Sequence, residues 1–127
     1  MNKKFVITAA ILITLAIMLG AFGAHGLKKI VTPEQVASFE AGVRYQFYAA
    51  FGLLILALNE DKFQTSIKVV YNLLLVGMFL FSFSIYLLSL QDYLNIKLAF
   101  LGPITPIGGV LMISSWIILT IKLIRSK

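Results

Sequence analysis

VVYNLLLVGMFLFSFSIYLLSL, residues 69–90, is the stretch that decides the fold, because it contains no charged side chain. A helix that crosses the hydrocarbon core of a membrane needs about 20 predominantly apolar residues. Three further stretches have this character: Phe5 to Ala24, Tyr45 to Leu58 and Leu98 to Leu123. The chain is therefore expected to cross a membrane four times.

Composition supports this expectation. Of the 127 residues 60% are hydrophobic, and the mean hydropathy is +0.96. Only 13% are charged, against about 25% in soluble domains. The sequence predicts a single all-α domain, a polytopic integral membrane protein with four transmembrane helices in a bundle. The spans are expected at about residues 5–26, 41–58, 68–90 and 103–124.

The first span has a rival interpretation. Lys3-Lys4, an apolar core and Ala21-Phe22-Gly23 are typical of a signal peptide with a cleavage site. Three later spans follow, so a retained helix is favoured.

The longest polar connection carries a helix start signal. Thr32-Pro33-Glu34-Gln35 fits a capping box, in which threonine caps the helix and glutamine reaches back three residues later. A helix is therefore expected to begin at Pro33. Val36, Phe39 and Val43 keep helical spacing, which predicts a short amphipathic segment before the second span.

The fourth span is interrupted near its start by Pro103 and Pro106. Proline lacks a backbone donor and disfavours helix in the residue before it. We therefore expect the helix to start near Pro106 with Thr105 as its cap, and residues 98–101 to form a separate short turn.

Lysine and arginine are distributed unequally between the two sides of the predicted bundle. The side with both termini carries Lys3, Lys4, Lys62, Lys68, Lys122, Arg125 and Lys127, and the other carries Lys28, Lys29, Arg44 and Lys97. The positive-inside rule then predicts that the N- and C-termini are cytoplasmic. Basic residues at span ends suit lipid headgroups, so the net charge of +6 does not indicate nucleic acid.

Small residues recur where helices are expected to pack. Ala16, Gly20 and Ala24 lie four apart in the first span, and Gly23 is beside them. Residues of this size let two helices approach closely in lipid. Packing within the bundle is favoured for this pattern, and a seam between two copies is the alternative. The other glycines assigned to helix packing are Gly42, Gly52, Gly108 and Gly109.

One polar cluster is a candidate site. His25, the single histidine, is expected on the same side of the membrane as Glu40 and Arg44, with Tyr45 and Tyr48 nearby. Ionisable groups at membrane depth are often functional. The alternative, which the sequence favours, is that the histidine caps the carbonyls that end the first helix.

Other sites are not expected. One histidine, no cysteine and few carboxylates predict no metal site, and we expect no cofactor. No nucleophile beside a base, no phosphate-binding loop and no facing pair of carboxylates appears in the sequence, so no enzyme is expected.

Hydroxyl groups form two further stripes at helical spacing. The third span aligns Tyr71, Ser82, Tyr86 and Ser89, and the fourth aligns Thr105, Gly109, Met112, Trp116 and Thr120. Such hydroxyls are expected to bond between helices.

Four blocks of sequence, taken together and in order, resemble a known family. They are Gly20 to Leu27 (GAFGAHGL), Arg44 to Tyr48 (RYQFY), Phe81 to Leu87 (FSFSIYL), and Thr105 to Gly109 (TPIGG) followed by Trp116. They look like the YgdD/YwdK family of small bacterial membrane proteins, also called domain of unknown function 423 and uncharacterised protein family 0382, and related to transmembrane protein 256.

The resemblance implies a four-helix protein of the bacterial plasma (inner) membrane without an established enzymatic activity, some of whose relatives are linked to membrane integrity. The family usually has histidine where this chain has Ala49, which argues against metal or haem ligation by a histidine pair. We expect a structural or membrane-homeostasis role through lipids, a homo-oligomer or a membrane-protein partner. The alternative is a small-molecule or lipid carrier with its polar site at His25, Glu40 and Arg44.

Overall fold

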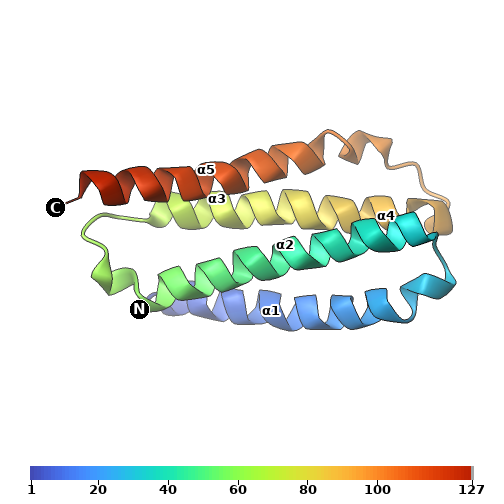
Figure 1. The fold of residues 1–127 in the computed structure, drawn as a ribbon, viewed down its shortest axis with the longest axis horizontal. Helices are drawn as coiled ribbons and strands as arrows, with labels where there is room; N and C mark the ends of the chain where they lie inside the picture. The colour runs from blue at the N-terminus through green and yellow to red at the C-terminus, as the bar shows by residue number, and fades with distance from the viewer. Residues whose placement is uncertain (127) are drawn as a thin grey trace.

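Four long helical segments run up and down along a common axis, so that α1 begins and α5 ends at the same end of the molecule (Figure 1). The structure is a computed structural model and describes residues 1–126; Lys127, counted above among the basic residues, lies outside them. The segments are α1 (Lys3–Ala24), α2 (Pro33–Leu58), the rod of α3 (Lys68–Met78), η3 (Phe79–Phe83) and α4 (Ser84–Leu94), and α5 (Ile104–Arg125).

Short helical turns occupy the connections: η1 (Leu27–Lys29), η2 (Glu60–Lys62) and η4 (Ala99–Leu101). Within residues 1–126 there is no strand. By length and apolar composition, each of the four long segments is able to cross a membrane.

The capping box predicted for α2 is present. The Thr32 hydroxyl accepts from the Gln35 N–H at 3.2 Å, and the Gln35 side-chain oxygen accepts from the Thr32 N–H at 3.0 Å. Two backbone donors that a helix start leaves unpaired are thus satisfied. The helix begins at Pro33, as predicted, and its amphipathic first turns continue without a break into the span, with Val36 and Phe39 buried.

The cap predicted for the last helix is wrong. α5 begins at Ile104 with Pro103 as its cap residue, and Thr105 lies inside the helix. Pro106 is tolerated there because it is the third helical residue, whose N–H would have no partner within the helix. The separate turn expected at residues 98–101 is confirmed by η4, which spans Ala99–Leu101.

The third span contains a wide turn. Phe79–Phe83 forms a π-helical segment, η3, between α3 and α4. The rod then ends at Asn95, whose backbone is left-handed with φ of 55°. Asparagine is one of the few residues that adopts this conformation at low cost, so its position explains the helix end.

The two inner segments carry most of the core. Figure 1 shows α2 and the α3–α4 rod between α1 and α5. Half of the residues in the most apolar stretch of α2 are buried, against 17% in α1 and 22% in α5. The outer faces of α1 and α5 are thus apolar and exposed, as is typical of helices that face lipid.

Two glycines allow the backbones of α3 and α5 to approach closely. A Cβ added to Gly77 would lie 2.7 Å from the Gly108 carbonyl oxygen, and one added to Gly108 would lie 2.6 Å from the Gly77 carbonyl oxygen. Atoms at these distances overlap, so neither position accepts a side chain without moving a helix. Gly108 was among the packing residues predicted from the sequence, and Gly77 was not.

Candidate functional site

The three ionisable residues of the predicted polar cluster lie near the end of the molecule that carries the first loop. His25 directly follows α1, and its backbone N–H donates to the Phe22 carbonyl at 3.2 Å. The His25 and Arg44 side chains are exposed, and Glu40 is half-buried. Within residues 1–126 the only ion pair joins the Met1 amino group to Asp61, so the structure does not bring the three together as ion pairs.

Glu40 lines a pocket together with one basic residue, Lys28. This pocket has a volume of about 340 Å³, and its other lining residues are Val31, Pro33, Val36 and Ala37.

Within residues 1–126 there is no group of three or more His, Cys, Asp or Glu side chains placed to hold a metal ion.

The two tyrosines of the predicted cluster do lie together. The rings of Tyr45 and Tyr48 meet edge-to-face with centroids 5.4 Å apart, and Tyr45 also contacts Phe81 at 4.9 Å. Both tyrosines are exposed. They line an apolar groove of about 400 Å³ together with residues of α3, η3 and α5, among them Trp116.

The small residues of α1 lie against α2. Ala16 and Gly23 are buried, while Gly20 and Ala24 are half-buried. A Cβ on Gly20 would make an ordinary contact with Val43 at 3.5 Å, and one on Gly23 would crowd the Phe39 ring at 3.2 Å. In this chain these residues therefore contribute to packing between neighbouring helices.

Three of the four packing glycines of α2 and α5 lie directly against a large side chain or against the backbone of another helix. A Cβ on Gly42 would lie 2.7 Å from the Tyr86 ring, and one on Gly52 would lie 2.6 Å from the Trp116 ring. Gly108 meets the backbone of α3 and η3. Gly109 leaves ordinary contact space of 3.6 Å beside Phe81.

A buried glutamine is the centre of the polar interior. Gln46 is fully buried in α2. Its amide nitrogen donates to the Leu12 carbonyl of α1 at 2.8 Å, and its oxygen accepts from the Tyr86 hydroxyl of α4 at 2.6 Å. One side chain thus connects three helices through two hydrogen bonds.

Three more hydroxyl contacts connect the helices. The Ser82 hydroxyl donates to the Gly42 carbonyl at 2.8 Å, and the Ser115 hydroxyl donates to the Val70 carbonyl at 2.9 Å. Ser84 and Thr105 share a hydrogen bond between their hydroxyl groups. Thr120, by contrast, bonds within its own helix to the Trp116 carbonyl at 2.8 Å. The expected interhelical bonds are present for Ser82, Tyr86 and Thr105. They are absent for Tyr71 and Ser89, whose hydroxyls have no partner in the described residues.

Gln46 and Ser115 were not among the site residues predicted from the sequence. Gln46 belongs to the RYQFY block, whose charged and aromatic members Arg44, Tyr45 and Tyr48 were. It is the one amide in residues 41–58. A polar residue within a span usually faces the interior and finds a partner there, so this signal was available in the sequence.

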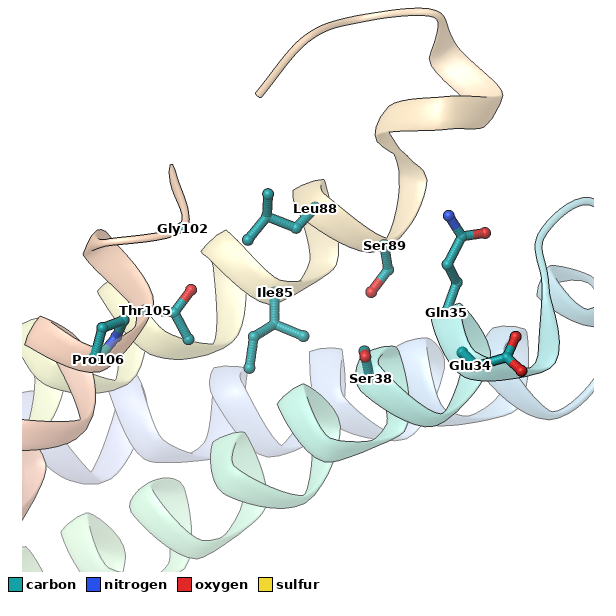
Figure 2. Close-up of a pocket in the computed structure, with 9 residues that line it drawn as sticks. All are labelled: Glu34, Gln35, Ser38, Ile85, Leu88, Ser89, Gly102, Thr105 and Pro106. Atoms are coloured by element: carbon teal, nitrogen blue, oxygen red, sulfur yellow. The ribbon is translucent and has the colours of Figure 1, made fainter. Parts of the chain in front are cut away.

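A second pocket opens beside the start of α2 and is drawn in Figure 2. Its volume is about 420 Å³. The lining residues come from the first turns of α2, from α4 and from the start of α5: Glu34, Gln35, Ser38, Ile85, Leu88, Ser89, Gly102, Thr105 and Pro106. We name it the α2–α4 pocket. None of these nine residues is Lys, Arg or His, so the lining carries one carboxylate and no cation.

Some polar side chains of the α2–α4 pocket already have hydrogen-bond partners, and one does not. Gln35 donates to Asp92 at 2.8 Å besides closing the capping box, and Thr105 bonds to Ser84. Ser89 is 3% exposed, and its hydroxyl has no hydrogen-bond partner in the described structure. The arrangement offers polar contacts at the rim and apolar ones from Ile85 and Leu88, which suits binding rather than bond-making chemistry.

Comparison with known proteins gives one family and several full-length relatives. Residues 19–109 match the family described as "Protein of unknown function (DUF423)". The chain is 38% identical to UPF0382 membrane protein YwdK of Bacillus subtilis over 97% of this chain and 98% of that protein. It is 35% identical to UPF0382 membrane protein SH2409 of Staphylococcus haemolyticus, covering 94% of each chain.

A more distant relative covers the whole sequence. A UPF0382 membrane protein of Haemophilus influenzae is 31% identical over 100% of this chain and 98% of its own length. No solved structure matches. The four long apolar helices and the names of these relatives, all membrane proteins, together confirm the prediction of an all-α polytopic integral membrane protein.

Proposed function

Because the chain belongs to the DUF423 family of UPF0382 membrane proteins, we propose a structural or membrane-homeostasis role that it performs through contacts with lipids or membrane proteins. The membership confirms the resemblance drawn from the sequence. The proposal places the chain in the bacterial plasma membrane and assigns it no enzymatic reaction.

One observation carries this proposal. Three buried polar side chains hold helices together: Gln46 bonds to Leu12 and Tyr86, Ser82 to Gly42, and Ser115 to Val70. Interhelical hydrogen bonds and close packing are what associates helices in lipid. The exposed outer faces of α1 and α5 remain for lipid or for a partner, which includes a second copy of the chain.

The orientation belongs to the same proposal. The end that holds Lys3, Lys4, Lys62, Lys68, Lys122 and Arg125 is proposed to be cytoplasmic, because basic residues are retained on that side. We expect alkaline phosphatase fused after Lys127 to be inactive and green fluorescent protein fused there to fluoresce. Fusions within the 95–98 connection should behave in the opposite way. An active phosphatase at the C-terminus would overturn the orientation.

The role itself is tested in a bacterial strain that lacks the chain. Loss of a membrane-homeostasis protein should raise the leakage of a small dye, and the wild-type chain should restore the barrier. We expect His25→Ala and Arg44→Ala to restore it as well, because both side chains are exposed and have no ion-pair partner. Membrane levels of each variant are measured by immunoblot.

The same strain separates the proposal from a carrier with its polar site at His25, Glu40 and Arg44. If either variant accumulates normally but fails to restore the barrier, the structural role is wrong and the polar site is favoured. A deletion strain that does not leak would also contradict the homeostasis role.

A further inference from the structure

We propose that the α2–α4 pocket binds an amphiphile whose head carries hydrogen-bond donors and no phosphate, namely the hydroxyls of an acylglycerol or the amine of a long-chain amine. The inference rests on the proposed role through lipid contacts for its class of ligand, and it adds a defined site to that role.

Ser89 is the first observation behind this site. A helical serine commonly bonds to the carbonyl four residues before it, and threonines of this chain do so, as Thr8 does to Lys4 at 2.9 Å. Ser89 is 3% exposed, and its hydroxyl makes no such bond in the described residues. A buried hydroxyl without a partner is costly in a native structure, and a ligand in the pocket would supply one.

The surroundings of Ser89 decide what that ligand offers. Figure 2 shows Ser38 on α2 and Ser89 on α4 on facing sides of the pocket, with Glu34 near its α2 rim. The Ser38 hydroxyl and the Glu34 carboxylate accept hydrogen bonds. Phosphate groups are normally held by Arg, Lys or several free N–H groups, and the lining contains no cationic residue. The pocket therefore favours a head that donates.

The apolar part of the lining explains why the ligand is an amphiphile. Glu34 and Gln35 belong to the first turn of α2, at the end of the bundle. Ile85 lies one turn before Ser89 on α4, and Figure 2 shows Ile85 and Pro106 on the side of the pocket away from Glu34. The pocket thus passes from polar at the membrane edge to apolar toward the membrane interior. A head at Ser89 and a chain along Ile85 and Leu88 match this order.

The test uses the purified full-length chain in lipid nanodiscs and a monoacylglycerol with a photoreactive diazirine in its acyl chain. We expect labelling of the α4 peptide around Ile85 and Leu88. Ser89→Ala should lower it about fivefold, since one hydrogen bond to the head is lost. Ser114→Ala, which removes a hydroxyl from α5 outside the lining, is the matched control and should label like the wild type.

Competition with unlabelled amphiphiles distinguishes hydroxyl heads from amine heads. An unlabelled monoacylglycerol and a primary amine of the same chain length should both displace the probe, and a phosphate monoester of that length should not. Glu34→Gln should weaken displacement by the amine alone, because only the amine is charged. Equal displacement by the phosphate, or unchanged labelling of Ser89→Ala, would overturn the proposed site.

The stability of Ser89→Ala shows that any loss of labelling is not a loss of folding. Without ligand this variant should unfold at the same temperature as the wild type or above it, because it removes the unpaired hydroxyl. Adding monoacylglycerol should raise the unfolding temperature of the wild type but not of the variant. If neither protein responds while both restore the membrane barrier, the binding site is wrong and the structural role stands.

Discussion

Gly108→Ala is expected to destabilise the folded chain by about 2 kcal/mol. The new methyl group would overlap the backbone of α3 and η3, lying 2.6 Å from the Gly77 carbonyl oxygen, 2.9 Å from the Leu80 carbonyl carbon and closer still to the Phe81 nitrogen. Overpacking of this kind costs about 3 kcal/mol when the neighbours are backbone that cannot turn aside. The higher helix propensity of alanine recovers about 1 kcal/mol. Unfolding in mixed micelles of increasing SDS content, followed by circular dichroism, measures the difference.

The adjacent residue provides a matched control. A Cβ on Gly109 would lie 3.6 Å from the Phe81 ring, which is ordinary contact. Gly109→Ala makes the same chemical change one position along the same helix, so it should be neutral or slightly stabilising. The two substitutions should therefore differ by about 3 kcal/mol. Equal stabilities for both variants would show that α3 and α5 do not approach as closely as the structure has them.

The second large effect is expected at Gln46. Gln46→Leu removes the bonds to Leu12 and Tyr86 and leaves the Tyr86 hydroxyl without its acceptor in a site that is 6% exposed. A buried polar group without a partner costs about 1–3 kcal/mol, and we expect a loss of about 2 kcal/mol. The same SDS titration applies.

A double-mutant cycle tests whether that loss comes from the Tyr86 contact. Tyr86→Phe alone should cost about 1 kcal/mol, and Gln46→Leu with Tyr86→Phe should cost less than the sum, by a coupling of about 1 kcal/mol. Tyr45→Phe is the control, because the Tyr45 side chain is exposed, and its effect should add to that of Gln46→Leu. Full additivity at Tyr86 would contradict the hydrogen bond.

The sequence was sufficient for features that depend on neighbouring residues. The four apolar stretches predicted the four long helices because length and composition alone decide whether a helix suits a membrane. The capping box at Thr32 was equally local, since both of its partners lie within four residues. Thr105 shows the limit of such reasoning: its hydroxyl bonds to Ser84, which lies 21 residues earlier in the chain.

The interior of the candidate site depended on contacts between helices. Gly77 matters only because Gly108 lies against it, and nothing near Gly77 in the sequence indicates that partner. The pairing of Gln46 with Tyr86 joins residues 40 apart. Tyr71, Ser82, Tyr86 and Ser89, which helical spacing assigned to one stripe, are all buried. Spacing does not say which residue on another helix each one meets.

Because of the wide turn at Phe79–Phe83, the number of residues in the third span is expected to be conserved among relatives. A π-helical turn holds one more residue than an α-helical turn, and each residue of a helix adds about 100° of rotation. Deleting one residue there would restore a regular helix and swing α4 around its axis, so that Ser82 and Tyr86 would no longer face Gly42 and Gln46. Relatives that lack this residue should therefore also have changed the residues at those two positions of the second span.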